Sequence, residues 1–180
     1  MACSQTLAGF KLSCDSSKGG IKVVYIAVYP GEGASGITSG VTVDATADTV
    51  SAISTGVTFY KYEIKRNTGS MTSTLNLDDA NGINYVSTDL VLQFNKMDAS
   101  KRAEMKALSL EQLLVVAVDS NGEAWVLGVN EPVTASAGTG QTGQNKTDGN
   151  FYQLTLQAND DSYPMTYSGN IGDLTINTGA

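Results

Sequence analysis

The chain has 180 residues, a formal net charge of −7 and no histidine. This length is enough for one domain with a substantial core, whereas the acidic balance argues against tight binding to phosphate backbones, which requires clustered lysine and arginine. Because histidine is the commonest general base and metal ligand, its absence also disfavours most hydrolase mechanisms.

A polar amino-terminal arm covers residues 1–18 and contains both cysteines, Cys3 and Cys14. It shows no basic segment followed by an apolar run, the pattern of a secretory signal, so we expect synthesis in the cytoplasm with free thiols. Two cysteines without histidine cannot complete a zinc site alone, and no apolar stretch approaches the roughly 18 residues of a membrane span. We expect residues 19–180 to form a single β-rich domain without a metal or cofactor.

Several strands are predicted in the first half of the chain. The nearly continuous apolar run at 21–29 is typical of a strand buried on both faces. The small residues of 31–56 predict a long excursion with a weak hairpin. Alternation by two then predicts strands at 57–66, 68–77 and 83–94.

The same alternation leaves one polar face on these strands uncommitted to the core. In 83–94 the inward positions include Val86, Leu90 and Leu92, and the intervening positions are polar. The side chains of the polar face are Lys61, Glu63, Thr72, Thr74, Asn76, Ser87, Asp89 and Gln93.

Asp98 is a suitable N-cap for the only convincing helix, at 98–109. Its apolar stripe contains either Ala103, Ala107 and Leu110 or Met105 and Leu108.

The second half of the chain returns to strands. The pair Asn121-Gly122 predicts a tight hairpin between 112–119 and 123–129, with Trp125 filling core beside it. Residues 130–150 have no apolar period and are predicted to be a loop. Strands are expected again at 151–157 and 171–177.

The glycine-rich segment contains Gly138, Gly140 and Gly143, which formally match G-x-G-x-x-G. The nucleotide-binding fingerprint joins a strand to a helix, but here a strand follows. Lys146 comes two residues too late for a phosphate-binding P-loop. The adjacent aspartates at 78–79 and 160–161 are typical of solvated turns, although paired carboxylates can divide acid and base roles. We therefore expect no catalytic residues.

Four segments within residues 14–164 occur in a distinctive order. They are YEIKRNTGSMTSTLN, then YVSTDLVLQFNKM running into DASKRAEMKAL, then LLVVAVDSNGEAWVLG, and finally TDGNFYQLTLQAND. In this order the chain resembles the phage major tail tube proteins, to which the type VI secretion tube protein is similar. The resemblance implies a mainly β fold, a β-sandwich or split β-barrel with one flanking α-helix and long loops. It also implies hexameric rings whose strands join into a large inner β-barrel.

The resemblance further implies a virion structural protein of a phage tail. DNA would pass through a bore of stacked rings without specific binding, and the polar-face residues named above would line or border that lumen. The partners would be further copies of the chain and other virion tail proteins, with no membrane. The candidates for contacts between rings or subunits are Gly33, Gly36, Gly40, Gly138, Gly140, Gly143 and Lys146.

Three alternatives stay open at this point. Tail terminator and head–tail connector subunits also form rings and could share this pattern. A monomeric β-sandwich module for binding or adhesion would be expected to display an aromatic platform or a calcium site, and neither is evident. An enzyme with an Asp-based site is a third alternative. The sign of the lumen charge is also open, because Lys61, Lys65 and Arg66 lie among the central strands.

Overall fold

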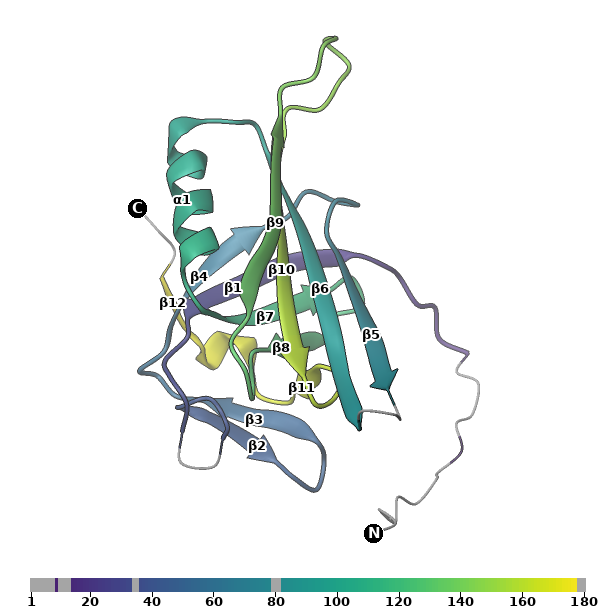
Figure 1. Cartoon of the computed structure of the whole chain (residues 1–180), viewed down its shortest axis with the longest axis vertical. Coiled ribbons are helices and arrows are strands. Elements are labelled where there is room, and N and C mark those ends of the chain that lie inside the picture. The colour runs from purple at the N-terminus through teal and green to yellow at the C-terminus, as the bar shows by residue number, and fades with distance from the viewer. Residues whose placement is uncertain (1–8, 10–13, 34–35, 79–81, 178–180) are drawn as a thin grey trace.

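A computed structural model describes residues 9, 14–33, 36–78 and 82–177. These residues form two β-sheets and one α-helix (Figure 1). The prediction of a mainly β fold with one flanking helix is confirmed. Neither sheet closes into a barrel within the described residues.

The larger sheet has eight strands in the order β12-β4-β1-β7-β8-β11-β3-β2. Its neighbours are antiparallel except for the parallel pairs β11–β3 and β12–β4. A short 3₁₀ helix at Ile171–Asp173 precedes the last strand. The strands are β1 (Ile21–Val28), β2 (Val41–Asp44), β3 (Thr49–Ile53), β4 (Thr58–Glu63), β7 (Leu113–Asp119), β8 (Ala124–Leu127), β11 (Met165–Tyr167) and β12 (Thr175–Asn177).

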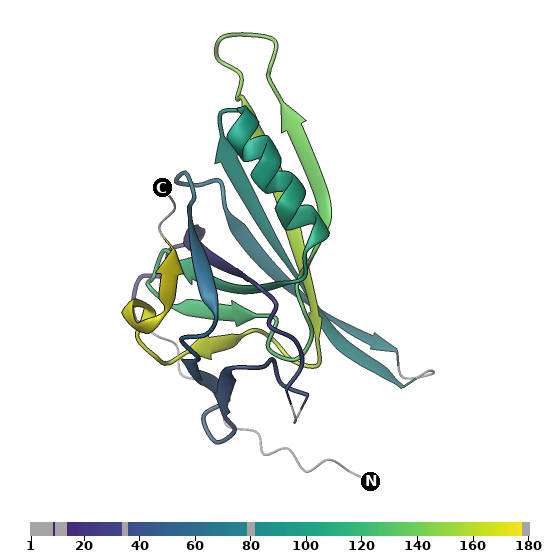
Figure 2. The ribbon, with the colours of Figure 1, turned by 90° about the vertical axis from the view of Figure 1, so that its left-hand side faces the viewer.

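The smaller sheet is fully antiparallel, in the order β5-β6-β10-β9. Its strands are β5 (Ser70–Asp78), β6 (Ile83–Asn95), β9 (Thr134–Gln141) and β10 (Phe151–Asp160). The helix α1 (Ala99–Leu110) lies on the β9 side of this sheet (Figures 1 and 2). Both hairpins of the sheet extend beyond the body, β5–β6 in one direction and β9–β10 in the other (Figure 2).

Two apolar clusters stabilise the fold. The first lies between the two sheets, where Val24 and Ile26 of β1 meet Leu90 and Leu154 of the smaller sheet. The second lies on the other face of the larger sheet and contains Phe59, with neighbours from several of its strands. Because clusters cover both faces, β1 and β7 are buried on both sides, which confirms the interpretation of the continuous apolar run in β1.

The structure also settles which apolar stripe of the helix is covered. Leu108 is buried and Met105 is half-buried against the cluster between the sheets, whereas Leu110 is exposed. Trp125 was expected in the core but is only half-buried, between the buried residues Ala124 and Val126.

The expected loop at 130–150 was wrong in its first half, because β9 occupies Thr134–Gln141. This strand pairs along its length with β10. The backbone pairing stabilises it, because its own small side chains bury little apolar surface. The expected strand at 171–177 is shorter than predicted, since the 3₁₀ turn occupies its beginning. Cys3, Asp79 and Asn81 lie outside the described residues.

Candidate functional site

The smaller sheet has one face on the core and one face that the other residues described by the structure leave open. Side chains at alternate positions of β6 are buried, from Val86 to Leu92, and those between them are more exposed. None of its four strands contains lysine or arginine, and their charged residues are Asp78, Asp89 and Asp160. Strand register places these polar side chains on the open face: Thr72, Thr74, Asn76, Ser87, Asp89, Gln93, Thr134, Thr139, Gln141, Gln153, Thr155 and Gln157.

A small hydrogen-bond network holds the centre of this open face. The Gln157 amide donates to Asp89 Oδ1 at 3.0 Å and to Ser87 Oγ at 3.2 Å, which joins β10 to β6. On the covered face, the hydroxyl oxygens of Ser73 and Thr88 lie 2.8 Å apart. Asp89 therefore places a negative charge in the middle of the open face, and register puts Asp78 and the apolar side chains of Ile83, Val91 and Phe151 on the same face.

The structure divides the predicted polar-face residues into two groups. One group shares the open face of the smaller sheet: Thr72, Thr74, Asn76, Ser87, Asp89 and Gln93. Lys61 and Glu63 instead belong to β4 in the larger sheet, where their side chains form an exposed ion pair at 2.8 Å. Their hydrogen bond raises the pKa of Lys61 and lowers the pKa of Glu63.

Sequence reasoning missed half of this face, namely the part contributed by β9 and β10. The alternation of Gln153, Thr155 and Gln157 with Leu154 and Leu156 was visible and could have placed β10 there. For β9, the sequence carries no comparable signal, because its covered positions hold alanine and glycine.

Four of the residues predicted to make contacts between rings or subunits lie in the β9–β10 hairpin. Gly138 and Gly140 lie within β9, and Gly143 and Lys146 follow in the turn toward β10. Asp148 organises the turn, since its Oδ2 accepts hydrogen bonds from the backbone N–H groups of Gln144 and Asn145 at 2.8 and 2.7 Å. These bonds hold the pKa of Asp148 below its usual value.

The other glycine candidates lie far from this hairpin, at the opposite end of the molecule (Figure 1). Gly33, Gly36 and Gly40 surround Thr38, whose N–H donates to the Val129 carbonyl at 2.7 Å. The Thr38 hydroxyl donates to the Gly128 carbonyl at 2.5 Å. The two sets of glycines therefore do not form one site.

Both edges of the smaller sheet are without a further strand among the described residues. Following the strand pairs across β6 and β10, Ser70 of β5 lies in the same row of the sheet as Ala137 of β9, and Thr72 lies in the same row as Thr134. From there β5 continues to Asp78 in one direction and β9 continues to Gln141 in the other. The midpoints of the two edge strands are thus displaced along the strand direction by about five residues, or roughly 17 Å.

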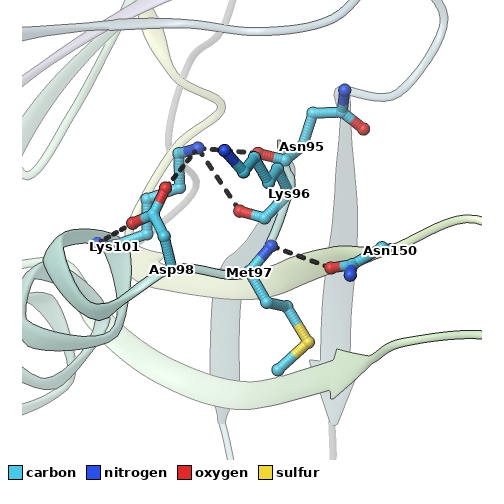
Figure 3. Close-up of polar contacts among 6 residues, drawn as sticks. All are labelled: Asn95, Lys96, Met97, Asp98, Lys101 and Asn150. Carbon is cyan, nitrogen blue, oxygen red and sulfur yellow. Dashed lines mark hydrogen bonds and ion pairs between the residues drawn. The ribbon is translucent and has the colours of Figure 1, made fainter.

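A set of polar contacts ties the start of α1 to the end of β6 and to the residue before β10 (Figure 3). Asp98 caps the helix, because its Oδ1 accepts from the Lys101 N–H at 2.8 Å. The Lys101 ammonium donates to the Asn95 carbonyl at 2.8 Å and to Asp98 Oδ2 at 3.2 Å. The backbone N–H of Met97 donates to Asn150 Oδ1 at 2.8 Å, which links the approach to the helix with the start of β10 (Figure 3).

No cluster of three or more metal-ligating side chains occurs in the part of the chain that the structure describes. Within the same residues, no helix has the length and apolar character needed to cross a membrane. Comparisons of the chain with protein-family models, with curated proteins and with solved structures found no match.

Proposed function

We propose that the chain is the structural subunit of a phage tail tube, in which rings of identical copies stack around a bore that conducts DNA. The observation that carries this proposal is the four-stranded sheet, with its polar, cation-free open face and its two free edges. Unpaired edges of this length are templates for further strand pairing. The simplest partner is another copy of the same sheet.

Strand direction and stagger both favour joining β5 of one copy to β9 of the next. The strands alternate in direction across the sheet, so this contact would be antiparallel and would continue the pattern. Full overlap of the two edges requires each copy to slide by roughly 17 Å for every ~19 Å of sheet width. That slide corresponds to a strand tilt of about 40°, within the 35–45° typical of closed barrels.

The size of such a barrel suits double-stranded DNA. A hexameric ring would contain about 24 tilted strands, with a diameter of roughly 50 Å between backbones. Side chains on the open face would leave a bore of about 40 Å, which is wider than a duplex of ~20 Å. Contacts that join copies head to tail close into rings when the rotation allows.

The charge of the open face also fits a conduit. DNA carries about one negative charge per 1.7 Å of duplex, so a wall with lysines would retain it. The exposed cations Lys61, Lys65 and Arg66 lie on or just after β4, in the larger sheet, and not on this face. A neutral to weakly acidic lumen would let DNA slide without binding.

Sedimentation velocity combined with negative-stain microscopy of the full chain tests the proposal. We expect rings or tubes with a central hole, in proportions that rise with protein concentration. Single rings that never stack would favour a terminator or connector subunit instead. A monomer at every concentration and salt condition would overturn the proposal.

A further inference from the structure

The β5–β6 hairpin carries apolar side chains that its own chain leaves uncovered. Leu75 is 42% exposed and Leu77 is 64% exposed. Both lie on the same face of β5 as Met71, which packs against the cluster between the sheets. The hairpin projects beyond the body (Figure 2), so no helix or strand of the described residues covers its far end. Neighbouring exposed leucines on a projecting element are typical of a contact surface.

A groove of about 400 Å³ lies at the opposite edge of the same sheet, between α1 and β9. Its walls are Met105, Lys106, Ser109, Ala135, Ser136, Ala137, Gly138 and Leu154. A Cβ added at Gly138 would make ordinary van der Waals contact with Gln153 O at 3.7 Å and Leu154 Cδ1 at 3.8 Å, so it would fit without a clash. The groove therefore has a small-residue floor that could admit a large side chain.

Pairing between copies would bring these two features together, and this inference rests on the proposed ring assembly. The two registers next to full overlap that keep both open faces on one side are slides of four and of six residues. The shorter slide, roughly 13 Å, sets Thr74 opposite Ala137 and Ser73 opposite Gly138. The register of β9 is irregular next to Ser136, so the following position of β5, Leu75, falls opposite Ala135.

We propose that Leu75 of one copy fills the α1–β9 groove of the next copy in the ring. Large side chains of β5 would then face small ones of β9, since Met71 would come beside Gly140 and Leu75 beside Ala135. Leu77 would cover the adjoining end of the groove. The helix α1 acquires a role in assembly, because it forms one wall of the socket for the neighbouring hairpin.

Cysteine cross-linking tests the contact directly. In a chain with Cys3→Ser and Cys14→Ser, one variant carries Leu75→Cys and a second carries Ala135→Cys. Directly opposed residues have Cβ atoms about 4.5–5.5 Å apart, so mild oxidation of the mixture should give a disulfide-linked dimer. Thr134→Cys is the matched control. Thr134 is the neighbour of Ala135 in the chain, but its side chain lies on the open face, whereas Leu75 lies on the covered face. Its cross-linking with Leu75→Cys should be at least tenfold weaker.

Filling the groove provides an independent test. Gly138→Val places a strand-favouring side chain where a Cβ makes only ordinary van der Waals contacts, so the monomer should keep its thermal stability. Assembly should need at least about tenfold more protein, as burial of one leucine typically contributes more than a factor of ten. Thr139→Val, on the opposite face of the same strand, should assemble normally.

The outcomes separate the two proposals. Rings that form without the Leu75–Ala135 cross-link, and that tolerate Gly138→Val, would overturn the groove contact and leave the tube subunit standing. A chain that stays monomeric under all conditions would remove both.

Discussion

In the proposed tube, a single cation placed on the open face should convert a passive bore into one that retains DNA. Gln153 is suited to this change because it lies on a central strand, opposite Gln93 on one side and Thr139 on the other. Gln153→Lys keeps a similar side-chain length, so the sheet should be preserved. The site is also four residues along β10 from Gln157, the partner of Asp89, so the new ammonium group would not be neutralised by that carboxylate.

The expected effect follows from the geometry of the proposed ring. Neighbouring copies would place the new ammonium groups roughly 25 Å apart around the ring, so a duplex resting on the wall would contact about one or two per ring. Each contact contributes on the order of 1 kcal/mol at low salt. A duplex that spans three rings should then lose affinity by roughly 20-fold to several hundred-fold between about 50 and 150 mM salt.

Co-sedimentation of assembled tubes with a fluorescent duplex measures this retention. Tubes of the unsubstituted chain and of Gln153→Glu should carry no duplex at any salt concentration. Gln112→Lys adds the same charge at an exposed position before β7, outside the open face, and should retain far less DNA. Equal retention by Gln153→Lys and Gln112→Lys would show that the open face does not line the bore. Tight binding by the unsubstituted tubes would refute the passive wall itself.

The remaining predictions concern the scaffold that holds the face in place. Leu92 is fully buried between the sheets, so Leu92→Ala should lower the free energy of unfolding by about 2–5 kcal/mol in urea denaturation; a loss below about 1 kcal/mol would contradict its place in the core. The helix-capping hydrogen bonds from Lys101 lower the pKa of Asp98. The ionised carboxylate therefore stabilises the fold at pH values above the ordinary pKa of aspartate, and this stabilisation is lost as the pH falls through the lowered pKa of the folded state. Asp98→Ala should therefore destabilise the chain at neutral pH, and the difference from the unsubstituted chain should shrink below roughly pH 4. A difference that is constant across this range would argue against an ionic cap.

Local sequence patterns correctly predicted those features that depend on residues within a single strand, helix or turn. The alternation of β6 identified Val86, Leu90 and Leu92 as covered positions, and all three are buried. Asp98 was identified as the helix cap, and its hydrogen bond to the Lys101 N–H confirms this. The turn at Asn121-Gly122 is also present, with a positive φ of 99° at Gly122. Each of these features depends on residues within a few positions of one another.

The strand β9 shows where local signals fail. Its covered positions are occupied by Ala135, Gly138 and Gly140, which bury too little apolar surface to produce a hydrophobic period. The segment is a strand because β10 offers it backbone partners from Thr134 to Gln141, interrupted only at Ser136. The pairing with β10 therefore cannot be predicted from the residues of β9 alone.

The sequence by itself determined which side chains share a face of each strand that it predicted. It could not decide which faces belong together. Lys61 and Thr72 both occupy alternating polar strands, yet β4 pairs with β1 and β5 pairs with β6, so they lie in different sheets. The physical reason is that period is set by local backbone geometry, whereas sheet membership is set by hydrogen bonds between residues distant in the chain. Only the tertiary structure could therefore define the open face, its stagger and the groove beside α1.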